Sequence, residues 1–370
     1  MIYLDYNATT PVDKEVAEVM ISYLYGHFGN PSSSHSLGRD AKSGIEQARQ
    51  QVADFLNCTP GEVLFTSGGS ESNNTVIKGV AQTYRHKGNH IIVSAVEHPA
   101  VIKPCQYLEQ LGYSITYVPV DSYGMVAVED VKEQLTDQTI LVSIMHSNNE
   151  TGTIQPIKEI AEACHERGVL VHTDASQSAG KVVLDVADLG VDFLTLAGHK
   201  LYAPKGIGAL YIREGIHIEP LIHGAGHEKG RRAGTENTPY IIGLGKACEL
   251  AADSASRERV GQITDYFFKK LQESFGEKIH LNGHLHKRLP NTLNVSFLGA
   301  VGHEVIASLE DVAASTGSAC HAGETSLSPV LKAMRVSEDI GQGAIRFSVG
   351  RYTTNAEIDE VIGKLKAYLL

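Results

Sequence analysis

One lysine near the middle of the chain has a context that could give it unusual chemistry. Lys200 follows the apolar residues 194–197 and the pair Gly198-His199. At the end of a buried strand an amine is partly desolvated, which disfavours the ammonium form and lowers its pKa. A neutral amine can condense with an aldehyde to form a Schiff base. The same stretch also fits a surface lysine after a strand, so the hypothesis of an aldehyde-binding lysine depends on its partners.

Pyridoxal phosphate is an aldehyde cofactor that would use such a lysine. It also needs an acid that faces the ring nitrogen, an anion cradle and a group that covers the ring. Asp174 ends the strand-like run 169–173 and could keep the ring nitrogen protonated, although an acid there could instead cap the next helix. One βαβ unit separates Asp174 from Lys200, which predicts that they lie on neighbouring parallel strands and favours a shared site.

Five other residues could surround that cofactor. His98 could stack on the ring and move protons, since its pKa lies near neutral pH, but taken alone it fits a loop histidine that bonds to the backbone. Gln177 could donate to the ring oxygen or could lie on the surface. Gly69 and Ser70 follow a strand and a glycine turn at the start of a helix, where free backbone N–H groups can bind an anion. With His199 they could hold the phosphate, and a capped tight turn is the alternative.

Cys320 differs from the other cysteines in its surroundings. It lies in the small and polar run 314–324, so we expect an exposed and mobile thiol that could visit the cofactor and leave again. Most cysteines in proteins are buried and inert. That interpretation fits the remaining four, which lie in or beside expected helices: Cys58, Cys105, Cys164 and Cys248.

Strands and helices alternate between residues 63 and 213. Apolar strands in this pattern predict an α/β fold with a mostly parallel central sheet that is flanked by helices on both faces. A short helix is expected over residues 176–180. Ligands of such sheets bind beyond the carboxyl ends of the strands. Five polar residues follow expected strands: Ser67, His98, Asn149, Asp174 and Lys200.

Two domains are expected. Residues 13–257 would form a large α/β domain that binds the cofactor. Residues 1–12 and 258–370 would form a smaller α+β domain that carries the cysteine loop, at about residues 315–328. The glycine-rich and basic residues 222–238 are too polar for a core, and we expect a loop that is solvated or reaches a neighbouring molecule.

The composition argues against several functions. A formal net charge of −11 disfavours broad binding to nucleic acids or anionic membranes. No apolar run reaches the roughly 18 residues of a membrane span. The first residues lack the basic segment and cleavage site of a signal peptide, so a cytoplasmic location is expected. The five cysteines include no Cys-x-x-Cys pair, so no metal site is expected.

Ten segments of the chain, in order, resemble cysteine desulfurases of the NifS/IscS type. These enzymes are pyridoxal-phosphate enzymes of fold type I, and the resemblance spans nearly the whole chain. One such segment would be a weak signal, whereas ten collinear ones are specific. They are YLDYNATTP (3–11), FGNPSS (28–33), TSGGSESN (66–73), EH (97–98), NNE (148–150), DASQ (174–177), GHK (198–200), RAGT (232–235), STGSAC (315–320) and RFS (346–348).

The resemblance implies a role for each matched residue. Lys200 would form the Schiff base, while the cofactor contacts would come from Asp174 at the ring nitrogen, His98 over the ring, Gln177 at the ring hydroxyl, and Gly69, Ser70 and His199 at the phosphate. Asn149 and Arg346 would bind the carboxylate of the substrate, L-cysteine. Cys320 would take the sulfur as a persulfide, which leaves L-alanine, and deliver it to an acceptor protein. The family forms homodimers, and Thr235 would reach the phosphate of the second subunit.

The chain also departs from the family pattern. Position 70 is Ser where many relatives have Thr, so a hydroxyl is kept. Position 197 is Ala where many have a phosphate-binding Ser, so that contact is expected to be missing. The residues His321-Ala322-Gly323 are similar to those of selenocysteine lyases. Three alternatives therefore stay open at this point: a selenocysteine lyase, a cysteine C–S lyase that releases free sulfide, and a non-enzymatic binding subunit.

Overall fold

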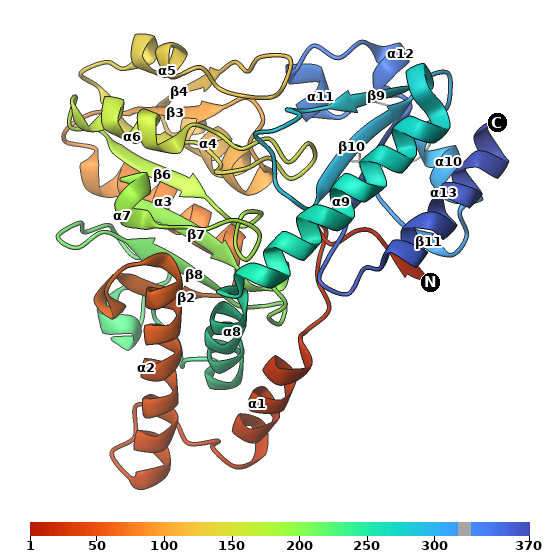
Figure 1. Ribbon diagram of the computed structural model, residues 1–370. Helices are drawn as coiled ribbons and strands as arrows, with labels where there is room; N and C mark the ends of the chain where they lie inside the picture. Colours follow the sequence, from red (N-terminus) through yellow and green to blue (C-terminus); the bar gives the residue numbers. More distant parts are fainter. Residues whose placement is uncertain (317–326) are drawn as a thin grey trace.

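The computed structural model describes residues 1–316 and 327–370, and its largest sheet has seven strands (Figure 1). The strand order is β2-β8-β7-β6-β5-β3-β4. Neighbouring strands are parallel except at β8, which runs antiparallel to β2 and β7. The expected mostly parallel sheet is therefore confirmed. The strands are β2 (Val63–Thr66), β3 (His90–Ser94), β4 (Ser114–Val118), β5 (Thr139–Ser143), β6 (Leu170–Asp174), β7 (Phe193–Ala197) and β8 (Gly208–Ile212).

Helices cover both faces of this sheet because its strands are apolar on both sides. Ile91 and Val93 of β3 share one hydrophobic core with α3 and α4, whereas Ile92 faces the other way and shares a core with α6. All three side chains are fully buried. The covering helices are α3 (Gly69–Tyr84), α4 (Pro99–Gln110), α5 (Val128–Gln134), α6 (Ile157–His165) and α7 (Val186–Leu189).

Three further helices pack together beside the β2–β8 side of the sheet (Figure 1). Helix α8 (Thr238–Ala251) contacts both α1 (Lys14–Tyr25) and α2 (Ser36–Leu56). Glycine permits the close approach of α8 and α2, because a Cβ on Gly245 would lie only 2.6 Å from the Cα of Ala48. Buried side chains of all three helices, such as Met20, Ile45 and Leu244, belong to the same hydrophobic core as one face of the sheet.

A smaller antiparallel sheet has the order β12-β10-β9. It shares a second hydrophobic core with α9 and α13, in which the rings of Phe267 and Phe347 are 5.2 Å apart. Strand β1 (Ile2–Tyr3) pairs in parallel with β11 (Val312–Ala313), so the first residues of the chain lie in this part. Its other elements are α9 (Ser254–Phe275), β9 (Ile279–Asn282), β10 (Thr292–Phe297), α10 (Gly302–Ser308), α11 (Pro329–Ala333), α12 (Glu338–Gly341), β12 (Ala344–Ser348) and α13 (Asn355–Leu369).

The predicted domain boundaries stay a prediction. Helix α9 begins at Ser254, so the boundary after residue 257 falls inside its first turn, and Figure 1 shows this long helix running from the large sheet to the small one. The predicted helix over residues 176–180 is wrong. This segment forms turns because Gly180 adopts a φ of 72°, which ends the single turn that Ala179 closes onto Ala175.

Four short 3-10 helices occur among the described residues, and one of them carries Lys200. The turn η2 (Gly198–Lys200) follows β7 directly, and it needs glycine at its start because a Cβ on Gly198 would lie 2.8 Å from a methyl group of Ile207. Within the described residues, no helix is long and apolar enough to cross a lipid bilayer. The other three turns are η1 (Pro60–Glu62), η3 (His227–Gly230) and η4 (Gly276–Lys278).

Candidate active site

A cavity of about 320 Å³ lies beyond the carboxyl ends of the parallel strands. The segments that follow β3, β5, β6 and β7 all contribute to its lining, together with the start of α3. This is the position at which open α/β sheets bind their ligands. The structure brings eight of the predicted site residues together here: Gly69, Ser70, His98, Asn149, Asp174, Gln177, His199 and Lys200.

Lys200 directs its amine toward the first residues of the chain. Its Nζ donates to the carbonyl oxygens of Asn7 and Ala8, the latter at 2.9 Å. Burial and the charge of Arg346 together lower the pKa of Lys200 to about 8, although the carboxylates of Asp174 and Asp5 oppose the change. A substantial fraction of the amine is therefore neutral near pH 8, as attack on an aldehyde requires.

Asp174 ends β6, and the strand register pairs it with Thr195 of β7. The prediction that Asp174 and Lys200 come from neighbouring parallel strands is therefore confirmed. One carboxylate oxygen of Asp174 accepts from Nδ2 of Asn73 at 2.7 Å, and the other accepts from the backbone N–H of Ser176 at 2.9 Å. The carboxylate thus caps a turn and lines the cavity at once, in an orientation that two hydrogen bonds fix.

Two histidines border the cavity, and the pKa of each is lowered. His98 is the N-cap of α4, and its Nδ1 accepts from the backbone N–H of Ala100 at 3.1 Å, which places the ring hydrogen on Nε2. Burial lowers the pKa of His98; the charge of Asp174 opposes this change, and the charge of Lys200 adds to it. Burial lowers the pKa of His199 to about 4. His98 therefore bonds to the backbone and also borders the cavity, so the two interpretations offered for it, a loop histidine and a histidine of the site, are compatible.

The first turn of α3 opens onto the cavity. Gly68 precedes it with a φ of 146°, a conformation that favours glycine. A Cβ on Gly69 would lie 3.0 Å from the hydroxyl of Ser176 and 3.4 Å from Ala197. Glycine therefore keeps this corner open, and the free N–H groups of a helix start there attract an anion.

Asn7 connects the lysine to Gln177. The Nε2 of Gln177 donates to the backbone oxygen of Asn7 at 2.9 Å, and this oxygen also accepts from Lys200. The Nζ of Lys181 donates to Oε1 of Gln177 at 2.9 Å and to Oδ1 of Asn7 at 3.0 Å. Gln177 is only 7% exposed, so the alternative of a surface glutamine is wrong.

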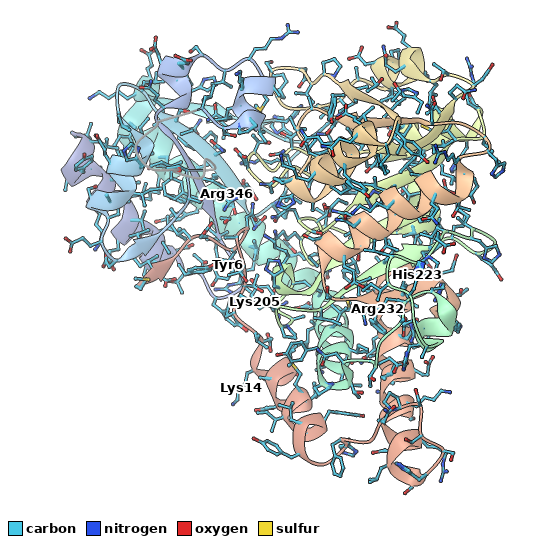
Figure 2. The ribbon with its side chains drawn as sticks, turned by 180° about the vertical axis from the view of Figure 1, so that it is seen from behind. Tyr6, Lys14, Lys205, His223, Arg232 and Arg346 are labelled. Atoms are coloured by element: carbon cyan, nitrogen blue, oxygen red, sulfur yellow. The ribbon has the colours of Figure 1, made fainter. Side chains whose placement is uncertain are left out.

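Arg346 comes from β12 in the small sheet and lies beside the cavity. Its guanidinium donates to the backbone oxygen of Asn149 at 2.9 Å and forms an ion pair with Asp5 at 2.7 Å. Among the described residues, Nε of Arg346 has no hydrogen-bond partner. Figure 2 shows Arg346 where the two parts of the molecule meet.

One predicted residue, Thr235, does not line this cavity. Thr235 is exposed and borders a separate cavity of about 200 Å³ with Ser67 and Arg232. Arg232 forms an ion pair with Glu71 of α3 at 2.9 Å and lies far from Arg346 in Figure 2. The role of Thr235 in a second subunit stays a prediction. Cys320 lies outside the described residues.

Three residues of the site were missed by the sequence reasoning. Asn73 holds the carboxylate of Asp174, while Asn7 and Lys181 hold Gln177. Asn7 and Asn73 lie within the segments YLDYNATTP and TSGGSESN, so their membership in these segments was the available signal. Lys181 offered only its spacing of one helical turn from Gln177.

Glu150 connects the segment after β5 to the second part of the molecule. The hydroxyl of Ser328, the N-cap of α11, donates to its carboxylate, and both side chains are buried. Burial raises the pKa of Glu150 from 4.5 to about 7, although Ser328 and Arg346 oppose the change. This carboxyl therefore binds its proton more tightly in the folded chain than in the unfolded one.

The raised pKa of Glu150 makes the free energy of unfolding decrease as the pH rises through about 7. Above about pH 7 the ionised Glu150 opposes folding, and Glu150→Gln removes that charge. We expect the free energy of unfolding of Glu150→Gln, minus that of the wild type, to increase as the pH rises from about 5 to about 9. Urea unfolding at matched pH values measures this difference. Glu133→Gln on the exposed side of α5 is the control, and a difference independent of pH would contradict the prediction.

The sequence matches one protein family and several of its named members over nearly the whole chain. The family model described as Aminotransferase class-V matches residues 2–361. The cysteine desulfurase IscS of Dictyoglomus turgidum is 47% identical to this chain, over 99% of the chain and 93% of its own length. The protein of the same name from Methanosarcina thermophila is also 47% identical, over 98% and 90% of the two lengths.

Solved structures agree with the sequence relatives. A protein named NifS-like superimposes with a TM-score of 0.93 at 38% identity and covers 100% of this chain and 99% of its own. A structure described as SspA in complex with cysteine gives a TM-score of 0.86 at 39% identity, with 96% and 100% coverage. The resemblance seen in the ten sequence segments is thereby confirmed, and this chain belongs to the class-V aminotransferase family.

Proposed function

We propose that this chain is an L-cysteine desulfurase that uses pyridoxal phosphate. It converts L-cysteine to L-alanine and passes the sulfur, as a persulfide on Cys320, to an acceptor protein. The observation that carries the proposal is the pairing of Lys200 with Asp174 at the ends of neighbouring strands in one cavity. Relatives named cysteine desulfurase and a similar structure that holds cysteine support the substrate.

The described residues of the cavity fit pyridoxal phosphate. Lys200 supplies an amine with a lowered pKa, and Asp174 supplies a carboxylate that Asn73 orients. The first turn of α3 supplies backbone donors beside Gly69, where a Cβ would fill the space needed by a phosphate. The volume of about 320 Å³ lies within the range of small-molecule sites, about 300 to 1,000 Å³. Ala197 has no hydroxyl to offer a phosphate, but the hydroxyl of Ser176 lies at the same corner of the cavity, beside Gly69.

When bound, the cofactor supplies an electron sink for negative charge on the α-carbon of an amino acid. Asp174 would keep the ring nitrogen protonated, because a carboxylate stabilises a neighbouring cation. His98 would cover the ring and offer the N–H of Nε2. Lys200 would remove and return a proton, since a pKa of about 8 allows both steps near neutral pH.

Arg346 and Asn149 would bind the carboxylate of the substrate. The guanidinium of Arg346 stands at the border of the cavity, and Asn149 lines the cavity itself. A substrate carboxylate would compete with Asp5 for the guanidinium, which forms charge-assisted hydrogen bonds with such groups. This arrangement would orient the amino acid before its sulfur is transferred.

The proposed sulfur transfer requires only the thiolate of Cys320 and the bound L-cysteine as reactants. The thiolate of Cys320 attacks the sulfur of cysteine, because the thiolate is the nucleophilic form of the side chain. An S–S bond forms as the C–S bond breaks, and the electron pair of the broken bond stays with carbon. That carbon takes up a proton and leaves as part of L-alanine, so no external oxidant or reductant is needed.

The proposal includes a homodimer in which residues 222–238 bring Thr235 to the phosphate of the partner. Thr235 is exposed and lies outside the cavity of its own chain, which supports a role in a second site. The loop is also anchored, since Glu228 forms a buried ion pair with Arg49 at 2.6 Å and accepts from the backbone N–H of Phe65. An anchored loop can present Thr235 at a defined position.

Mass spectrometry after incubation with L-cysteine tests this function. We expect one added sulfur on the peptide that contains Cys320 and one L-alanine for each sulfur, whereas protein incubated with L-alanine stays unmodified. Free sulfide without a modified cysteine would indicate a C–S lyase. Preferential turnover of L-selenocysteine would indicate a selenocysteine lyase, and a protein that binds no pyridoxal phosphate would indicate a binding subunit.

A further inference from the structure

Lys181 is a second lysine beside the site, and the proposed reaction does not use it. It follows Gly180 in the turns after β6, one helical turn from Gln177 in the sequence. Its Nζ donates to two amide oxygens, Oε1 of Gln177 at 2.9 Å and Oδ1 of Asn7 at 3.0 Å. Among the described residues, no carboxylate forms an ion pair with this amine.

The bond from Lys181 determines which way the amide of Gln177 faces. The Nζ of Lys181 donates to Oε1 of Gln177, and an ammonium, which has no lone pair, can face only the oxygen of an amide. The amide nitrogen then points to the other side, where it donates to the backbone oxygen of Asn7 at 2.9 Å. A neutral amine keeps two hydrogens, enough for both acceptors, so both hydrogen bonds can form in either protonation state of Lys181.

One N–H of Gln177 remains after these bonds are counted. An amide nitrogen carries two hydrogens, and the backbone oxygen of Asn7 takes one of them. Gln177 lines the cavity, so the second hydrogen is available to an acceptor there. If the amide were reversed, its oxygen would face the cavity and would repel an oxygen of the ligand.

We propose that Lys181 is a positioning residue that fixes the amide of Gln177, so that an N–H rather than a carbonyl faces the ring hydroxyl of pyridoxal phosphate. The inference rests on the proposed function and deepens it. Lys181 would act on the cofactor only through its hydrogen bond to Gln177, without contacting the cofactor or the substrate itself.

Packing alone does not call for a lysine at this position. Burial lowers the pKa of Lys181 well below its usual value, and the charges of Lys200 and Arg346 act in the same direction. Burying such an amine opposes folding unless hydrogen bonds compensate it. A methionine has a similar length and needs no partners, so what the amine adds here is its two donated hydrogen bonds.

The test compares the holoenzymes of wild type, Lys181→Met, Gln177→Met and the double variant. Two properties are measured, namely the dissociation constant for pyridoxal phosphate and the pH midpoint of the visible absorbance of the bound cofactor. We expect each single variant to bind the cofactor about 5- to 30-fold more weakly, as loss of one hydrogen bond implies, and to shift the midpoint in the same direction. The double variant should add little to either single one, because both changes remove the same interaction.

Several outcomes would overturn the inference. A Lys181→Met holoenzyme with the midpoint and affinity of the wild type would do so, and so would effects that add in full in the double variant. Gln177→Met with an unchanged midpoint would overturn it even if Lys181→Met does not fold. Lys158→Met, on the exposed side of α6, is the matched control. If the wild type binds no pyridoxal phosphate, the proposed function fails instead.

Discussion

Lys200→Ala is expected to lose the visible absorbance of bound pyridoxal phosphate and to slow cysteine desulfuration on the order of 10³-fold or more. The substitution removes the amine that lines the cavity and bonds to Asn7 and Ala8. Lys181 cannot replace it, because its amine is bonded to Gln177 and Asn7. Lys181 is also not among the described residues that line the cavity of about 320 Å³. Absorbance spectra and L-alanine formation measure the two effects.

Lys14→Ala is the matched control for this prediction. Lys14 is an exposed lysine at the start of α1, well away from Arg346 and the strand ends in Figure 2. Its removal should leave both the spectrum and the rate of alanine formation close to those of the wild type. A Lys200→Ala protein that keeps the absorbance band would place the cofactor lysine elsewhere and would contradict the proposed site.

The adjacency of Asp174 and Lys200 could be predicted because apolar runs in the sequence indicate where buried strands end. Asp174 and Lys200 each follow an apolar run, and the connection between those runs is long enough for a parallel crossover. The register of β6 and β7 confirms their adjacency. The direction of β8 could have been predicted as well, since the short link from Ala197 to Gly208 favours an antiparallel return over a crossover.

The supporting bonds could not be predicted in the same way. Asn7 contacts Gln177 and Lys181 across more than 160 positions of the chain, and Asp5 meets Arg346 across 341. Pairs this distant leave no periodic pattern in the sequence, because only the docking of one core against the other brings them together. Thr235 is harder still, since its proposed target lies in another copy of the chain.

The four described cysteines are poor candidates for the sulfur acceptor. Burial raises the pKa of Cys58, Cys105 and Cys164 to about 12, and it raises the pKa of Cys248 as well. A thiol with so high a pKa is almost entirely protonated at neutral pH, and the thiolate is the nucleophilic form. The chemistry therefore leaves Cys320, which lies outside the described residues, as the remaining cysteine in the chain.

Cys320→Ala is accordingly expected to abolish the persulfide and to reduce L-alanine formation on the order of 10³-fold or more, while the absorbance of bound cofactor stays as in the wild type. The cofactor contacts proposed for Lys200 and Asp174 do not involve the thiol, so binding and sulfur transfer should separate. Cys58→Ala is the matched control, because its protonated thiol cannot serve as the acceptor. Mass spectrometry, sulfide release and alanine formation are measured together. Undiminished release of free sulfide by Cys320→Ala would assign the reaction to a C–S lyase, since that chemistry needs the cofactor site and no nucleophilic cysteine.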